Sequence, residues 1–418
     1  MRIKTTLAAA LMAVGFVCQA SAANVVYLTG STAMRSTVYN QLNTPGAIFD
    51  SGATITRATR KFSGSNPNGA SYMLFLGTIS GTPTYINCVW SGSEAGIASA
   101  ANVTLDNDGQ PLAGSPATWL KADGSVAMTD ATSAPAAGEL ETFSHGADLA
   151  TADTSQAVSW TPYVANTSTA LKDYGSMGIV TFTWVKNVNT APNAAWTNLK
   201  SITTYQMQAL FSSPQHAALF TGVSTDTNYV YLVGRNKGSG TRANALADSG
   251  FGISTAVNQF SVGGGVSTPA TNLLVLASEL NNGFESGGSV ATALSVDGSC
   301  AQVDPFYGYP GWLAVGYLST GDAQKGGLTV TNNWLSENGV AESNGTVMDG
   351  QYSFWGNEHL LGKQNIGGYQ DAVGSKLFNA IKNTLNATAP NPANHDGAIG
   401  TRWMNASKVS DTAYPTHN

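Results

Sequence analysis

The stretch Tyr229–Thr241 reads YVYLVGRNKGSGT and joins a strand to a glycine-rich turn. Its first five residues are all apolar or aromatic, which predicts a buried strand over Tyr229–Val233. The following residues combine glycines for a tight turn, hydroxyl groups, and Arg235, whose planar guanidinium suits bidentate binding of an oxyanion. A strand that runs through such a turn into a helix is typical of α/β folds.

Two earlier strand candidates end in turns of the same composition. Asn24–Leu28 is followed by TGST at 29–32, and Tyr85–Trp90 is followed by SGSEAG at 91–96. Because helix N-termini offer free backbone N–H groups, several such turns at one edge of a sheet would form an anion site. Taken singly, such turns are more often ordinary turns or helix caps, so the prediction rests on their co-occurrence and order. Further elements are expected at Ala33–Leu42, Gly178–Val185, Thr204–Phe211 and Asp371–Leu385.

Length and charge limit the classes of protein to consider. A chain of 418 residues suits two domains. Charged residues make up 11%, less than half of the roughly 25% typical of soluble domains. The net charge is -6, and there is no basic tail or stripe, which argues against a nucleic-acid partner.

The N-terminus has the pattern of a secretory signal peptide. Arg2 and Lys4 precede the apolar run Leu7–Val17, and Ala20–Ala22 is a small-residue cleavage site. We therefore expect residues 1–23 to be removed from a periplasmic or secreted bacterial protein. No later segment approaches 18 uninterrupted apolar residues, so no membrane insertion is expected. Cys88 and Cys300 then predict one disulfide, with two buried thiols as the alternative.

In this order, the motifs resemble those of the phosphate-binding proteins that feed Pst-type ABC transporters, which are class II periplasmic binding proteins. Arg235–Thr241 matches the family pattern Arg-x-x-Gly-Ser-Gly-Thr at every fixed position. The other matching segments are Leu28–Thr32, Gly92–Ile97, Asp148–Asp153, Pro310–Leu318 and Tyr352–Trp355. The long stretch 101–139 between the second and third motifs, rich in small polar residues, is interpreted as a surface insertion.

The resemblance implies an α/β fold of two lobes, each a mostly parallel sheet flanked by helices, with a hinge between them. Residues 24–186 plus 346–418 would form lobe I, and residues 187–345 lobe II. It also implies inorganic phosphate as ligand, an ABC permease as possible partner, a monomer, and no cofactor, metal or catalytic residue. The implied ligand-binding residues are Ser31, Thr32, Ser93, Asp153, Arg235, Ser239, Gly240 and Thr241.

Asp153 has a specific role under this resemblance. Its carboxylate would accept the proton of hydrogen phosphate, whereas sulfate has no proton to donate and would be repelled. The alternative is that Asp153 is a surface or helix-cap residue. Two departures from the family pattern are Lys237, where the family commonly has Asp, and Glu94 beside the second turn.

Two other functions remain as alternatives. A surface or adhesin-like protein on the same fold, with altered or lost anion binding, fits the Thr/Ser/Asn-rich composition. A phosphatase-type enzyme would need a nucleophile with a nearby base. The five histidines lie in no catalytic signature, and no Gly-x-Ser-x-Gly elbow surrounds Ser93 or Ser239.

Overall fold

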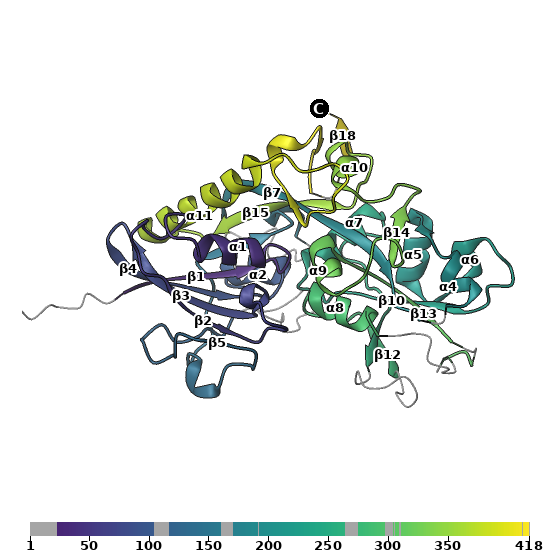
Figure 1. The fold of residues 1–418 in the computed structure, drawn as a ribbon, viewed down its shortest axis with the longest axis horizontal. Helices are drawn as coiled ribbons and strands as arrows, with labels where there is room; N and C mark the ends of the chain where they lie inside the picture. Colours follow the sequence, from purple (N-terminus) through teal and green to yellow (C-terminus); the bar gives the residue numbers. More distant parts are fainter. Residues whose placement is uncertain are drawn as a thin grey trace, which may run out of the picture.

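The computed structural model describes residues 23–103, 117–159, 170–190, 192–263, 275–296, 304, 306–308, 311–411 and 413–417. The predicted signal peptide lies outside these ranges except for Ala23. Figure 1 shows two α/β halves joined by long central strands. A mixed α/β fold of two lobes, as predicted, is confirmed.

The first half is built on a sheet with the strand order β5-β2-β3-β4-β1-β6-β15-β7. Strand β1 lies between β4 and β6 and is parallel to both, so their carboxyl ends meet at one edge. Antiparallel strands extend the sheet on both sides. The elements are β1 (Asn24–Gly30), α1 (Arg35–Leu42), β2 (Thr56–Arg60), β3 (Tyr72–Ile79), β4 (Thr82–Val89), α2 (Ser93–Ala100), β5 (Asp130–Ala131), β6 (Leu149–Ala152), β15 (Trp355–Gly362) and α11 (Gly368–Ala387).

The second half is centred on the parallel pair β10 and β13. Its core contains residues of both strands and of helix α8 (Gly287–Leu294). The other elements are α4 (Ala194–Asn198), β8 (Ser201–Ile202), α5 (Thr204–Ser212), β9 (Gln215–His216), α6 (Ala218–Thr221), β10 (Tyr229–Val233), α7 (Gly240–Asp248), β11 (Gln259–Gly263), β12 (Val275–Leu280), β13 (Leu313–Ser319), α9 (Thr320–Lys325), β14 (Trp334–Glu337) and α10 (Asn344–Met348).

Strand β7 (Lys172–Lys186) belongs to both halves. Its residues 172–181 pair with β15, and its residues 182–186 pair with β13. The last ten residues of the strand are all buried, which explains why the apolar run 178–185 was recognisable as a strand. A single continuous strand therefore connects the sheet of the first half to that of the second.

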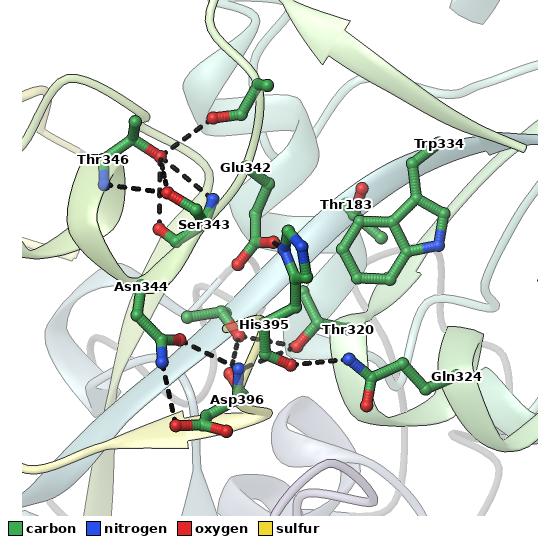
Figure 2. Close-up of polar contacts among 12 residues, drawn as sticks. Thr183, Thr320, Gln324, Trp334, Glu342, Ser343, Asn344, Thr346, His395 and Asp396 are labelled. Atoms are coloured by element: carbon green, nitrogen blue, oxygen red, sulfur yellow. Dashed lines mark hydrogen bonds and ion pairs between the residues drawn. The ribbon is translucent and has the colours of Figure 1, made fainter. Parts of the chain in front are cut away.

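The C-terminal segment returns to this central region. It adds β16 (Ala398–Ile399) to β7 and ends in the hairpin of β17 (Ala406–Lys408) and β18 (Pro415–His417). Figure 2 shows how the loop before β16 is held. Asp396 exchanges two hydrogen bonds of 2.8 Å with the side chain of Asn344, and His395 Nδ1 lies 2.6 Å from Glu342 Oε2. These contacts fix the C-terminal loop to the start of α10.

Part of the predicted surface insertion is buried. Within its described residues, Trp119 and Leu120 are fully buried and pack near Tyr27 and Tyr85 of the first-half sheet. The segment therefore adds a small apolar layer to the first half.

Cys88 is buried in the core and forms no disulfide with a residue that the structure describes, and burial raises the pKa of its thiol. Cys300 lies outside the described residues, so the predicted disulfide is not shown.

Candidate functional site

The first predicted turn closes the end of β1. The backbone N–H of Ser31 donates to the carbonyl oxygen of Thr151 in β6 at 2.8 Å. Ser31 and Thr32 are both buried, and Ser31 Oγ has no hydrogen-bond partner among the described residues. A buried hydroxyl without a partner is costly, so Ser31 Oγ can contact a ligand or the buried carboxyl of Glu358 beside it.

The second turn brings Ser93 to Asp153. Ser93 is the first residue of α2, and its hydroxyl accepts a hydrogen bond of 3.2 Å from the backbone N–H of Asp153. Asp153 follows β6 directly, its side chain is buried, and its Oδ1 atom has no partner within the described part of the chain. Burial raises the pKa of Asp153 to about 6, against the opposing influence of Ser93 and Arg235.

The third turn places Arg235 in the interior between the halves. Its Nη2 atom donates to the carbonyl oxygen of Glu285 at 2.8 Å, and Nε donates to that of Phe284 at 3.2 Å. The guanidinium also lies 3.5 Å from the hydroxyls of Thr241 in α7 and Thr32 after β1. Arg235 is thus held by its own half and reaches the first turn of the other half.

The beginning of α7 closes the arrangement. Ser239 caps the helix, since its hydroxyl accepts a hydrogen bond from the backbone N–H of Arg242 at 3.3 Å. A Cβ atom on Gly240 would lie 1.6 Å from Asp153 Oδ1 and 2.7 Å from Ser93 Cβ. Only glycine allows α7 to approach these residues so closely.

The structure therefore brings all eight predicted residues into one buried region. Thr32, Arg235 and Thr241 form one connected group, and Ser93, Asp153 and Gly240 form a second. Ser31 is the sequence neighbour of Thr32 in the first group, and Ser239 is the sequence neighbour of Gly240 in the second. A direct contact between the halves is also present, where the backbone N–H of Ala95 donates to the carbonyl oxygen of Gly238 at 3.1 Å.

Glu94 does not oppose an anion in the way its position in the sequence suggests. It is buried, and its carboxylate accepts hydrogen bonds from the hydroxyls of Thr154, at 2.7 Å, and Ser159. Backbone carbonyl oxygens of Phe284 and Glu285 support the guanidinium of Arg235.

Three charged residues near this site were not predicted. Glu358 in β15 is fully buried beside Ser31 and Thr151, and burial raises its pKa well above the ordinary value. Arg35 and Asp322 are also buried, and the charges of both act on Arg235. An isolated acidic or basic residue in a strand or helix usually lies at the surface, which is why no sequence signal identified them.

A cleft of about 240 Å³ adjoins the site. It is lined by Ser91 and Asn236, which precede and follow predicted site residues, and by the aromatic residues Tyr72 and Trp90. The cleft gives solvent access to the boundary between the halves.

Within the described residues, no group of His, Cys, Asp and Glu side chains could hold a metal ion, and no helix is long and apolar enough to span a membrane. His395 and Glu342 form a close pair, but the nearby hydroxyl of Ser343 lies against Thr346 and accepts a hydrogen bond from its backbone N–H (Figure 2). The pair and this serine therefore do not form a nucleophile–base arrangement.

No family model matches the chain, and no curated protein matches it. Solved structures do align with it. A putative phosphate ABC transporter substrate-binding protein with bound phosphate from Clostridium perfringens is 13% identical, with a TM-score of 0.44 over 86% of this chain and 93% of that chain. An ABC-type phosphate transport receptor from Vibrio cholerae is 12% identical, with a TM-score of 0.39 over 84% and 93%. A possible phosphate binding protein from Planctomyces limnophilus is 12% identical, with a TM-score of 0.37 over 88% and 89%.

Proposed function

We propose that this protein binds hydrogen phosphate between its two lobes, outside the cytoplasm, as the substrate-binding component of a phosphate uptake system. One observation carries the proposal: turns far apart in the sequence place a buried guanidinium, a buried carboxylate and several hydroxyls in one region. The proposed ligand-binding residues are the eight described above. The proposed role is non-enzymatic: these groups would bind the ligand through hydrogen bonds and charge.

The chemistry of the region favours a partly protonated oxyanion. Arg235 and the N-termini of α2 and α7 attract negative charge. Asp153 would repel a fully ionised anion, but its free Oδ1 atom can accept the proton of hydrogen phosphate. The same atom disfavours sulfate, which has no proton to donate at neutral pH.

The position of the site also suggests how binding is transmitted. Thr32 and Asp153 come from the proposed lobe I (24–186 plus 346–418), and Arg235 and Gly240 come from the proposed lobe II (187–345). A ligand that contacts both lobes favours the state in which they are together. The protein is proposed to act as a monomer and to present this state to an ABC permease.

Titration calorimetry of phosphate-stripped mature protein tests the proposal. We expect 1:1 binding of phosphate, much weaker binding of sulfate, and loss of binding in Arg235→Ala and Asp153→Ala. Lys200→Gln, a change of an exposed residue in the second half, serves as the control. If the well-folded wild-type protein gives no heat with phosphate, the proposal is wrong and the surface-protein alternative takes its place.

A further inference from the structure

A second concave surface lies beside the proposed phosphate site. It is an open groove of about 620 Å³ between the two halves, lined by residues of both. Its size is within the range of pockets that hold small organic ligands and exceeds what one phosphate ion requires.

The charges in this groove are unusual for the chain. The charged residues in its lining are Arg35, Lys61, Lys325 and Asp322. The whole protein has 19 basic and 25 acidic residues, yet here cations outnumber carboxylates by three to one. The groove is therefore a local region of positive charge in an acidic protein, and it suits an anionic group.

Arg35 is the most informative of these residues. It is only 9% exposed, and its side chain makes no hydrogen bond or ion pair with any residue that the structure describes. Burial lowers its pKa, partly offset by the charge of Asp322. The Nε atom of Arg35 is buried and has no hydrogen-bond partner among the described residues, so this donor can bind a ligand group in the groove.

The backbone at the groove adds further donors. Helix α8 is eight residues long and begins at the groove, where Ser286 caps it and Ser289 forms part of the lining. Its free N–H groups lie at the positive end of the helix dipole. Lys325 is tied to the other half, because its Nζ atom donates to Ser36 Oγ at 2.7 Å.

The groove is electrostatically linked to the first site. Arg235 has its pKa lowered chiefly by burial, and the charge of Arg35 lowers it further. Asp322 acts on both guanidiniums in the opposite direction. Asp153 also acts on Arg235, whereas Asp322 is the carboxylate that acts on Arg35, so the positive charge of the groove depends on Arg35, Lys61 and Lys325.

We propose that the groove is a second anionic subsite, and that the ligand class is a diphosphate whose second phosphoryl group binds Arg35, Lys61 and Lys325. This inference rests on the proposed phosphate site, which would hold the first phosphoryl group. The ligand is either free pyrophosphate or an organic diphosphate, since the groove has room for a substituent.

Titration calorimetry in metal-free buffer tests the inference, with phosphate, pyrophosphate and ADP as ligands. Because the second group gains charge-assisted hydrogen bonds, we expect pyrophosphate to bind about tenfold or more tightly than phosphate. Tight binding of ADP as well would identify the organic class, and a preference for pyrophosphate alone would identify the free ion. Either result supports the proposal.

Two variants locate the effect. Arg35→Gln should reduce the ratio of pyrophosphate to phosphate affinity about tenfold. Lys61→Gln, an exposed change that does not threaten folding, should reduce the ratio about threefold, and Lys200→Gln should leave it unchanged.

Two outcomes separate this inference from the function on which it rests. If phosphate binds but pyrophosphate has no advantage, or if Arg35→Gln weakens both ligands equally, the second subsite is refuted and the phosphate site stands. If neither ligand binds to folded protein, the proposed function itself fails.

Discussion

Gly240 provides a sharp test of how the two lobes meet. The substitution Gly240→Ala adds a methyl group at the first residue of α7, where it would lie 1.6 Å from Asp153 Oδ1 and 2.7 Å from Ser93 Cβ. Real Cβ contacts are essentially never shorter than 3.0 Å, so the oxygen and the helix must separate by at least 3.0 - 1.6 = 1.4 Å.

This displacement is large compared with a hydrogen bond. Lengthening an O–H···O contact of about 2.7 Å by that amount breaks it. Loss of one charge-assisted bond corresponds to about 1.5–3 kcal/mol, and about 1.4 kcal/mol is a tenfold change in affinity. We therefore expect Gly240→Ala to weaken phosphate binding at least about tenfold.

Calorimetric titration measures this loss, and thermal unfolding shows whether the unliganded fold is retained. Gly368→Ala is the matched control, because Gly368 is also the first residue of a helix and has no atom within 4 Å of the added Cβ. Phosphate affinity unchanged in Gly240→Ala would refute the close approach of α7 to Asp153.

Three further predictions concern buried charges. Asp153→Asn should weaken phosphate binding yet raise the melting temperature. Burial raises the pKa of the Asp153 carboxyl from 3.8 to about 6, so its ionisation costs the unliganded fold about 3 kcal/mol. In thermal unfolding, the difference in melting temperature between Asp153→Asn and the wild type should appear between about pH 4 and 6. A difference that does not depend on pH would contradict the raised pKa of Asp153. Arg235→Lys should retain the fold by circular dichroism but bind phosphate at least about tenfold more weakly, since a lysine cannot bind bidentately; equal affinity would exclude a direct contact. Burial disfavours the His359 cation, but hydrogen bonds to Asp173 and Asp411 outweigh this effect and raise the pKa of His359 to about 10. The free energy of unfolding should therefore fall as the pH rises from about 6.5 toward 10. The variant His359→Gln should abolish this pH dependence.

Several strands and helices of the fold, including a strand that leads into the proposed phosphate site, were predictable. Tyr229–Val233 coincides with β10, and the predicted helix Thr204–Phe211 is one residue shorter than α5. Tyr229–Val233 is a continuous apolar run, and the buried residues of α5, Met207, Leu210 and Phe211, have helical spacing. Turn residues follow the strand, and Thr203 caps the helix. The glycine-rich turns were identifiable because glycine and hydroxyl residues occur there for a local reason.

The partners contributed from distant segments were not predictable. Glu358 reaches Ser31 only because β15 crosses the sheet beside β6. Arg35 has an ordinary sequence context at the start of a helix, and its burial depends on the second half packing against it. A single sequence contains no periodicity or spacing that encodes such contacts between lobes.

The path of the chain through the first half also affects the order in which the protein can fold. Strand β6 (Leu149–Ala152) pairs with β15 (Trp355–Gly362), and helix α11 packs on β7 and α1. The residues between β6 and β15, which include the centre of the second half, are synthesised before β15 and α11. The sheet around β1 must therefore remain incomplete until nearly the entire chain is available. Pairing across such long sequence separations slows folding, so an early, independent collapse of the N-terminal half is disfavoured.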